Sequence, residues 1–202
     1  MKRSRLFVMI CTGVIAAIWS GYHVVTRANL SPSLLPGEMI DAFNGVAVYH
    51  NGGMNNTHGR HLSADGYNIG LRYQCVEFVK RYYLERFSHK MPDSYGHARD
   101  FFDPALADGN INPKRGMIQY ANGSSMPPEP EDLIVFGPTL LNPYGHVAIV
   151  TEVGDGSLKI IQQNTFSSRE TLSLSTEAGG YRISAQNTLG WLRLPGTFPA
   201  TR

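Results

Sequence analysis

Residues 71–87 read Leu-Arg-Tyr-Gln-Cys-Val-Glu-Phe-Val-Lys-Arg-Tyr-Tyr-Leu-Glu-Arg-Phe, and the rest of the chain is organised around this stretch. Val76, Val79, Tyr83 and Phe87 recur at the spacing of one helix face. The charged side chains fall largely off that stripe: Lys80, Arg81, Glu85 and Arg86. The pattern predicts an amphipathic helix whose apolar face packs on the core and whose charged face meets water.

A cysteine occupies the first turn of this predicted helix. The unpaired N–H groups and the positive end of the helix dipole favour a thiolate at such a position. The chain has two cysteines, and Cys11 lies in an apolar N-terminal segment, so Cys75 has no partner for an intramolecular disulfide. A lone thiol in an exported domain is either buried and inert or kept because it reacts. The position of Cys75 favours the second alternative, a nucleophile.

Composition excludes some classes of function. The 202 residues carry a formal net charge of +2, and no basic run alternates with aromatic residues. The sequence therefore predicts no nucleic-acid partner. The length suits one domain of ordinary size with additional segments, and the aromatic content of 10% favours a packed core over disorder.

The N-terminus has the features of a segment that enters a membrane. A basic leader, residues 1–5, precedes the apolar stretch 6–25. This stretch is a signal peptide or a single membrane anchor, and it just reaches the length of a bilayer span. A clean small-x-small cleavage site is missing, which favours an uncleaved anchor. We therefore expect an inner-membrane anchor with a periplasmic or extracellular domain, or alternatively secretion to the periplasm.

Four segments follow from these features. Residues 1–28 form the signal peptide or transmembrane anchor, and residues 29–40, rich in Ser, Pro and Leu, form a linker. Residues 41–196 form the folded domain, and residues 197–202 form a tail.

Within the domain, the elements are predicted from local patterns. Residues 46–49 predict a short strand, and the Gly- and Asn-rich residues 51–70 predict a loop. Residues 98–102 predict a short helix. The Pro- and Gly-rich residues 110–130 predict a long connection that covers or shapes a substrate site. Strands are predicted at 132–136, 146–153, 158–164, 181–184 and 189–194. A helix followed by antiparallel strands predicts an α+β fold.

A thiol nucleophile needs a base, and one of the seven histidines differs from the others. His146 opens an apolar strand directly after a glycine, where a polar ring must find partners. The remaining histidines lie in the anchor or in or beside predicted loops, where solvated side chains are expected: His23, His50, His58, His61, His89 and His97. His146 is therefore the predicted base.

The hairpin after His146 supplies the group that orients the base. A two-residue turn at residues 155–156 would place Gln163 on the face of His146, because side chains alternate along a strand. A three-residue loop at residues 154–156 would instead place Asn164 opposite His146 and Gln162 opposite Ala148. We adopt the second register, which predicts a Cys75–His146–Asn164 triad.

Two other classes of function compete with this interpretation. His58 and His61 have the spacing of a metal-ligand pair, but they lie in a predicted loop without an acidic cluster. The prediction is accordingly that no metal and no cofactor is needed. A module that only binds the cell wall or a partner is the second alternative.

Three short motifs resemble those of the CHAP family, papain-like cysteine amidohydrolases within the NlpC/P60 superfamily. They are Tyr-Gln-Cys-Val-Glu-Phe at 73–78, Gly-His-Val-Ala-Ile-Val at 145–150 and Gln-Gln-Asn at 162–164. The similarity is greatest to the amidase domain of bifunctional glutathionylspermidine synthetase/amidase and covers roughly residues 40–195. The resemblance implies a papain-like α+β fold in which the nucleophile helix packs on an antiparallel sheet.

The resemblance also implies roles for individual residues. Cys75 would form an acyl-thioester with His146 as its base, and Gln74 would help the Cys75 backbone N–H hold the oxyanion. Many members have an acidic residue where this chain has Gln162. Asn164 would then orient the ring, as an amide does in papain-like enzymes, with Gln162 in a supporting position.

The expected function is cysteine-dependent amide hydrolysis outside the inner membrane. Peptidoglycan peptides are the expected substrates, because they are the abundant unusual amides in that compartment. Two alternatives stay open: a glutathionylspermidine-type amidase, and a catalytically weak CHAP-like binding domain.

Overall fold

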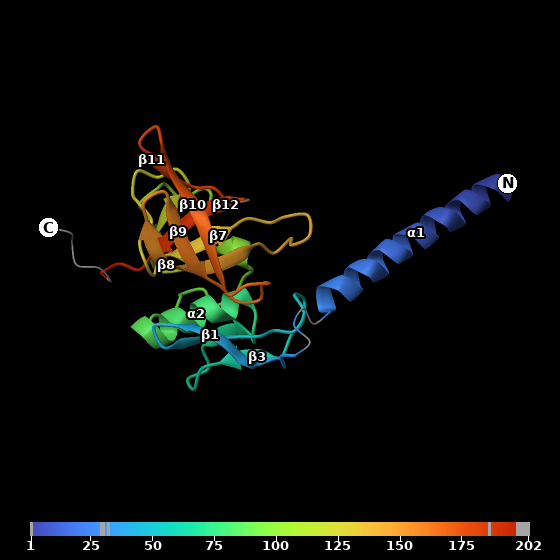
Figure 1. Cartoon of the computed structure of the whole chain (residues 1–202), viewed down its shortest axis with the longest axis horizontal. Coiled ribbons are helices and arrows are strands. Elements are labelled where there is room, and N and C mark those ends of the chain that lie inside the picture. Colours follow the sequence, from blue (N-terminus) through green and yellow to red (C-terminus); the bar gives the residue numbers. More distant parts are fainter. Residues whose placement is uncertain (1, 29–30, 32, 186, 197–202) are drawn as a thin grey trace.

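A long N-terminal helix stands clear of a mixed α/β body in the computed structural model, as Figure 1 shows. The structure describes residues 2–28, 31, 33–185 and 187–196. The predicted tail at 197–202 and part of the predicted linker lie outside these residues.

The body combines short strands with one full helix. The helices are α1 (Lys2–Arg27), α2 (Cys75–Phe87) and the 3₁₀ turn η1 (Ala98–Phe101). The strands are β1 (Met39–Phe43), β2 (Val46–Tyr49), β3 (Arg60–Leu62), β4 (Asn68–Leu71), β5 (Ile111–Asn112), β6 (Met117–Ala121), β7 (Leu133–Phe136), β8 (His146–Gly154), β9 (Ser157–Ile161), β10 (Arg169–Glu177), β11 (Gly180–Ile183) and β12 (Thr188–Arg193).

One antiparallel sheet forms the main layer. Among the described residues it has eight strands in the order β11-β10-β9-β8-β7-β12-β6-β5, and β1-β2 and β3-β4 form separate two-stranded ribbons. The helix α2 packs against β8 on one side and against β2 and β4 on the other. The predicted α+β arrangement, with the helix on an antiparallel sheet, agrees with this architecture.

Alternation along β8 divides the core into two clusters. Val147 and Ile149 face α2 and join Cys75 and Phe78 in one buried cluster. Ala148 and its neighbours on the other face pack around Trp191 in the second. Because both faces of β8 are buried, the strand reads as a continuous apolar run after its first residue. The first residue, His146, lies at the end of the strand where the core stops.

The predicted helix is present with the predicted start, and it begins at Cys75. It ends at Ser88, whose left-handed backbone (φ 56°) lets its own N–H and the next one reach back to Leu84 O and Tyr83 O. Val79 and Tyr83 are fully buried, as the apolar stripe predicts. The prediction that the charged side chains all meet water is wrong.

Two of those charged residues lie inside the domain. Lys80 donates to Asn68 O and Ser94 O, and burial lowers its pKa to about 8. The Arg81 side chain pairs with Glu77 and stacks over the Tyr49 ring. The β3-β4 ribbon and β2 cover this face of α2, so charges that would be solvated on a free helix become buried and paired.

Two segments predicted to be loops contain strands. Residues 51–70 contain β3 and the start of β4, which pair with each other. Residues 110–130 contain β5 and β6, and β6 pairs with β12 at one end of the main sheet. The prediction of a covering loop at 110–130 is therefore wrong. Strands this short carry weak periodicity, and β6 joins the main sheet through β12, a partner distant in the sequence.

The helix α1 meets the length and composition criteria for a membrane span. Residues Met9–Arg27 have a mean hydropathy of 1.4, and 6% of the assessed window is buried. Its end meets the body near residues 53–55, where Asn55 N–H donates to Thr26 O at 2.9 Å and Gly53 lies against the Arg27 backbone.

Candidate active site

The thiol of Cys75 lies where α2 meets the first residues of β8. The backbone N–H groups of Val147, Val76 and Cys75 itself lie close to its sulfur. These donors all favour the thiolate, in line with the predicted effect of a helix start. Burial acts in the opposite direction and is the larger effect, since the side chain is 8% exposed. It raises the pKa of the thiol to about 11. The helix-start donors and burial thus act in opposite directions on the pKa of this thiol.

His146 follows Gly145, a position where any side chain would force the neighbouring backbone to move. Gly145 has φ +75°, and a Cβ there would lie 2.5 Å from Phe136 O and 3.0 Å from Arg99 N. This tight corner brings the chain into β8 with the His146 ring against the Phe136 ring, their centroids 5.9 Å apart. His146 is thus held at the first position of β8, one residue before the Val147 N–H that lies close to the Cys75 sulfur.

The β8-β9 hairpin has the predicted pairing near its open end, but this pairing does not come from the predicted three-residue turn. Gly154 pairs with Ser157, so the turn has two residues and not three. A bulge between Val150 and Glu152 then shifts the pairing, and Ile149 lies opposite Ile161. Continuing this register places Gln162 opposite Ala148, as predicted. The bulge thus restores the pairing that a three-residue loop would have produced.

The prediction that Asn164 orients His146 is wrong. The His146 Nε2 atom lies 2.9 Å from Gln162 Oε1, so Gln162 is the hydrogen-bond partner of the ring. The strand β9 ends at Ile161, and Asn164 adopts φ +65°, which turns the chain away from the face of His146. The position that lacks the acid is therefore the position that contacts the base.

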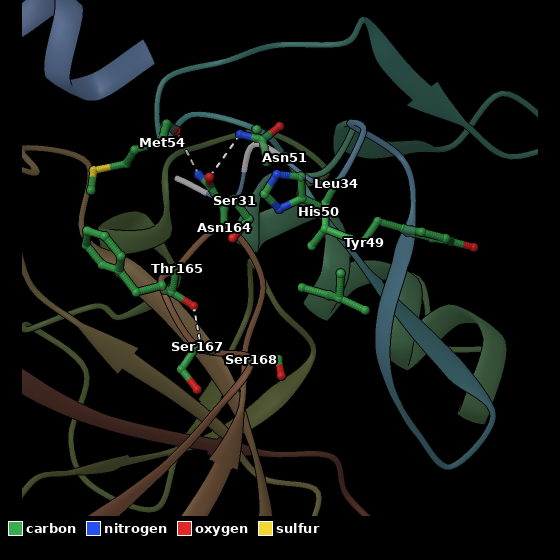
Figure 2. A pocket seen from close by; sticks show the side chains of 13 residues that line it. Ser31, Leu34, Tyr49, His50, Asn51, Met54, Asn164, Thr165, Ser167 and Ser168 are labelled. Atoms are coloured by element: carbon green, nitrogen blue, oxygen red, sulfur yellow. Dashed lines mark hydrogen bonds between the residues drawn. The ribbon is translucent and has the colours of Figure 1, made fainter. Parts of the chain in front are cut away.

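Asn164 instead binds the loop on the other side of the nucleophile. Its Nδ2 donates to Met54 O at 2.8 Å and to Gln74 Oε1 at 2.6 Å, and its Oδ1 accepts from Asn51 Nδ2 at 2.9 Å. Figure 2 shows Asn164 directed toward Asn51 and Met54. Asn164 therefore fixes the surroundings of Gln74.

The side chain of Gln74 is held by two backbone carbonyls. Its Nε2 donates to Asn56 O at 2.6 Å and to Met54 O at 3.3 Å. The residue caps the start of α2 with an extended backbone, immediately before the nucleophile. A role for Gln74 at the oxyanion stays a prediction.

A pocket of about 300 Å³ borders this side of the site (Figure 2). Its lining includes Asn164, Asn51 and His50 together with hydroxyl and apolar side chains from three segments of the chain. Among the described residues that line it, none is an Asp, Glu, Lys or Arg. The pocket is accordingly polar but carries no fixed charge.

The thiol and the imidazole that are predicted to react with each other have pKa values shifted in opposite directions. Burial lowers the pKa of His146 to about 4, against a smaller opposing effect of the Gln162 hydrogen bond. Burial raises the pKa of Cys75 to about 11, so both groups are neutral at neutral pH. A neutral pair of this kind would transfer its proton only when a substrate is attacked, as a serine and its histidine do.

Glu77, a carboxylate that the sequence did not single out, links α2 to the segments packed around it. Glu77 is 2% exposed, and its carboxylate accepts from Arg81 Nε at 2.8 Å and from Gln163 Nε2 at 3.0 Å. Gln163 in turn donates to Gln74 O and accepts from Tyr49 N–H. The signal was an acid in the first turn, adjacent to the cysteine motif, on the same side as Arg81 at i+4.

The two histidines considered as a metal pair have separate partners. His58 Nε2 lies 3.1 Å from Asn51 O, and His61 Nδ1 lies 2.8 Å from Glu77 Oε1. Within the described part of the chain, no group of three or more His, Cys, Asp or Glu side chains is placed to hold a metal ion.

Comparison with known proteins adds a family. The family described as "CHAP domain" matches residues 64–164, which is half of the chain and includes both Cys75 and His146. Two curated proteins of Crithidia fasciculata are similar. The first, a trypanothione synthetase, is 32% identical over 145 residues, covering 65% of this chain and 22% of that protein. The second, a glutathionylspermidine synthase, is 31% identical over 143 residues, covering 64% of this chain and 20% of that protein. The chain thus spans about a fifth of these relatives.

Solved structures that resemble the chain include the endolysin LysIME-EF1, at 20% identity and a TM-score of 0.35, covering 70% of this chain and 61% of that one. A structure of Ly7917 with the hydrolysing product of MDP also has 20% identity and a TM-score of 0.35, covering 61% and 54%.

Proposed function

The chain belongs to the CHAP domain family of amidases and peptidases, and from this membership we propose that it hydrolyses amide bonds of peptidoglycan peptides through Cys75. The observation that carries the proposal is the hydrogen bond that holds the His146 ring. The His146 Nε2 atom lies 2.9 Å from Gln162 Oε1, and the N–H of the next residue, Val147, lies close to the Cys75 sulfur. The order of a helix-borne cysteine and a strand-borne histidine is papain-like.

The chemistry follows from which nitrogen Gln162 occupies. Its Oε1 is an acceptor, so His146 carries its proton on Nε2 and presents Nδ1 unprotonated. Nδ1 takes the thiol proton as the Cys75 sulfur attacks the amide carbonyl. The same nitrogen then protonates the leaving amine, which leaves an acyl-thioester. Water, deprotonated by His146, attacks the thioester and releases the acid and the free thiol. Gln162 thus takes the orienting role predicted for Asn164.

We expect the activity to extend far into the acid range. The base must be unprotonated, and burial holds the pKa of His146 at about 4 rather than the usual 6.5. The acid limb of kcat/KM against pH reports the free enzyme, so its midpoint should lie well below 6.5. A midpoint at or above 6.5 would show that the ring is not a buried neutral base.

The lowered pKa of His146 should also make folding stability depend on pH. Between pH 6.5 and about 4 the unfolded chain binds a proton at His146 that the folded chain excludes. Folding stability should therefore fall as the pH falls through that window, and replacing His146 by Gln should weaken this dependence. Thermal unfolding across the same pH range separates this effect from loss of chemistry.

The substrate class is supported by the N-terminal helix and by the charge of the pocket. The helix α1 is long and apolar enough to act as a membrane anchor or a signal, which fits a domain outside the inner membrane. The lining of the pocket next to Asn164 offers amide and hydroxyl groups without fixed charge. Such a lining suits the backbone amides of a peptide.

A glutathionylspermidine-type amidase is the second candidate. It is favoured by the two curated relatives, whose names refer to trypanothione and glutathionylspermidine. A spermidine group is a polycation, and acidic side chains would be expected around it. None line the pocket in the described structure, which ranks this candidate second.

A paired assay tests the proposal. The full chain in detergent is incubated with purified sacculi and, separately, with glutathionylspermidine. We expect muropeptides to be released from sacculi, with a Cys75→Ser variant as the inactive control. Release of spermidine without muropeptides would instead select the second candidate, and product from neither substrate would refute both.

A further inference from the structure

The carboxylate missing from position 162 is present one side chain further away. The Gln162 amide that holds His146 on one side donates through Nε2 to Glu170 Oε2 and to Ser167 O, each at 3.2 Å. We propose that Glu170 is a positioning residue of the catalytic site and acts on His146 through Gln162. The proposal rests on the proposed function of Cys75 and His146 and names a component of the same site.

The acceptors around Gln162 determine which way its amide points. An amide has a donating and an accepting end, and the wrong orientation would place its NH₂ group against His146. A carboxylate and a backbone carbonyl only accept hydrogen bonds at neutral pH. Since Glu170 and Ser167 O both lie on the Nε2 side, Oε1 must face the histidine. Gln162 is 5% exposed, whereas Glu170 lies at the surface, so the bridge runs from the interior to the solvent boundary.

The orientation of the amide in turn selects the tautomer of the base. With Oε1 as its neighbour, His146 keeps its proton on Nε2 and presents Nδ1 as the base. If the amide turned, the NH₂ group would favour a lone pair on Nε2, and the proton would move to Nδ1. That form cannot accept the thiol proton. Glu170 therefore controls a step of the reaction without touching the thiol.

The charge of Glu170 provides a second effect. When His146 becomes an imidazolium during the reaction, the bridging amide is polarised between a cation and a carboxylate. The neighbouring Arg169 does not compete for this carboxylate, because its guanidinium binds Asp41 and Ala42 O. An aspartate or glutamate in direct contact would supply the same support more strongly. The bridge is accordingly a weaker form of that arrangement.

The backbone keeps the bridge in place. Glu170 pairs with Ile160 across the β9-β10 ladder, and Gln162 N–H donates to Ser168 O at 2.8 Å. The two ends of the turn that carries Asn164 are therefore joined directly beneath the Gln162 side chain. This geometry requires no movement of the main chain for Glu170 to reach the amide.

Removal of the acceptor should change the chemistry of the thiol itself. In a Cys11→Ser background, we expect Glu170→Leu to slow alkylation of Cys75 by iodoacetamide at neutral pH by about 5-fold, and to lower kcat/KM by about 10-fold. Glu170→Gln retains an acceptor but no charge and should lie between the two. Glu152→Leu, an exposed glutamate on β8 that pairs with Lys159, is the matched control and should have no effect.

The tautomer is observed directly. In ¹⁵N-histidine spectra, assigned with a His146→Gln variant, the wild-type ring should carry its proton on Nε2. The Glu170→Leu ring should show a mixture of the two tautomers. The alkylation and NMR measurements need no substrate, so they test Glu170 even if the proposed substrates prove wrong. Failure of the proposed function would instead appear as retained hydrolysis in the Cys75→Ser variant.

A second background distinguishes a positioning role of Glu170 from a general loss of structure, because the effect of Glu170→Gln on kcat/KM should change sign there. In a Gln162→Glu background, a carboxylate contacts His146 directly, and Glu170 becomes an adjacent like charge. Glu170→Gln should then leave kcat/KM unchanged or raise it, although it lowers kcat/KM in the wild-type background. Equal losses in both backgrounds, or no loss in the wild-type background, would overturn the proposal. Thermal unfolding of each variant checks that the comparison is made on folded protein.

Discussion

Replacement of Cys75 by Ala should abolish amide hydrolysis, lowering kcat by roughly 10⁴-fold or more. The reason is chemical, because without the sulfur no acyl-enzyme forms and His146 has no proton to accept. The fold should persist, since the side chain is small and the N–H groups around it belong to backbone already fixed in α2 and β8. The measurement is release of muropeptides by purified protein, together with a thermal unfolding curve.

The controls for this variant distinguish the competing functions. Cys11→Ser changes the other thiol, in α1, and should leave the activity of the domain unchanged. If Cys75→Ala retained activity and a chelator abolished it, a metal mechanism would replace the thiol mechanism. If neither the wild type nor the variant hydrolysed the cell wall and both bound it equally tightly, the chain would be a binding module. An enzyme loses turnover while its substrate affinity changes far less.

Replacement of Glu77 by Ala should destabilise the domain by about 3–5 kcal/mol, the largest stability effect that we expect. The carboxylate is buried and is the acidic partner of the Arg81 guanidinium, which is 3% exposed. Removing the acid leaves that charge buried without compensation and leaves Gln163 Nε2 with one acceptor fewer. Chemical denaturation measures the change in the free energy of unfolding.

A matched variant on the same helix tests the mechanism. Glu85 is exposed on α2, and Glu85→Ala should change stability by no more than about 0.5 kcal/mol. The double variant Glu77→Ala/Arg81→Ala should be more stable than the sum of the two single changes predicts, because the unpaired charge is gone. A small cost for Glu77→Ala alone would refute the role assigned to this buried pair.

The hydrophobic pattern was sufficient to predict the helix and the strand that carry Cys75 and His146. The spacing of Val79 and Tyr83 predicts α2 and its start at Cys75, and the run after His146 predicts β8. These predictions succeed because period and burial are related locally, within one element. The same reasoning failed for Lys80 and Arg81, since a second layer, the β3-β4 ribbon, covers the polar face of the helix.

The hydrogen-bond partner of His146 could not be predicted from the sequence for a different reason. The family motif includes both Gln162 and Asn164, and sequence spacing alone assigned the role to Asn164. A bulge in β8, the end of β9 at Ile161 and a left-handed Asn164 together bring Gln162 to His146. Each of these is a change of backbone conformation at a single residue, and each changes which side chain faces the ring. No periodicity in the sequence records them.

The sequence by itself predicted Cys75 and His146 as the reactive pair and placed one at a helix start and the other at a strand start. A cysteine at a helix start and a histidine at a strand start are local features, defined by residues that are neighbours along the chain. Only the tertiary structure decided the protonation of the pair and the identity of the third residue. Burial makes the pair neutral at rest, and the pairing of β9 with β10 brings Glu170 to the amide that holds His146. Both depend on groups brought together from separate strands, and that proximity exists only in the folded chain.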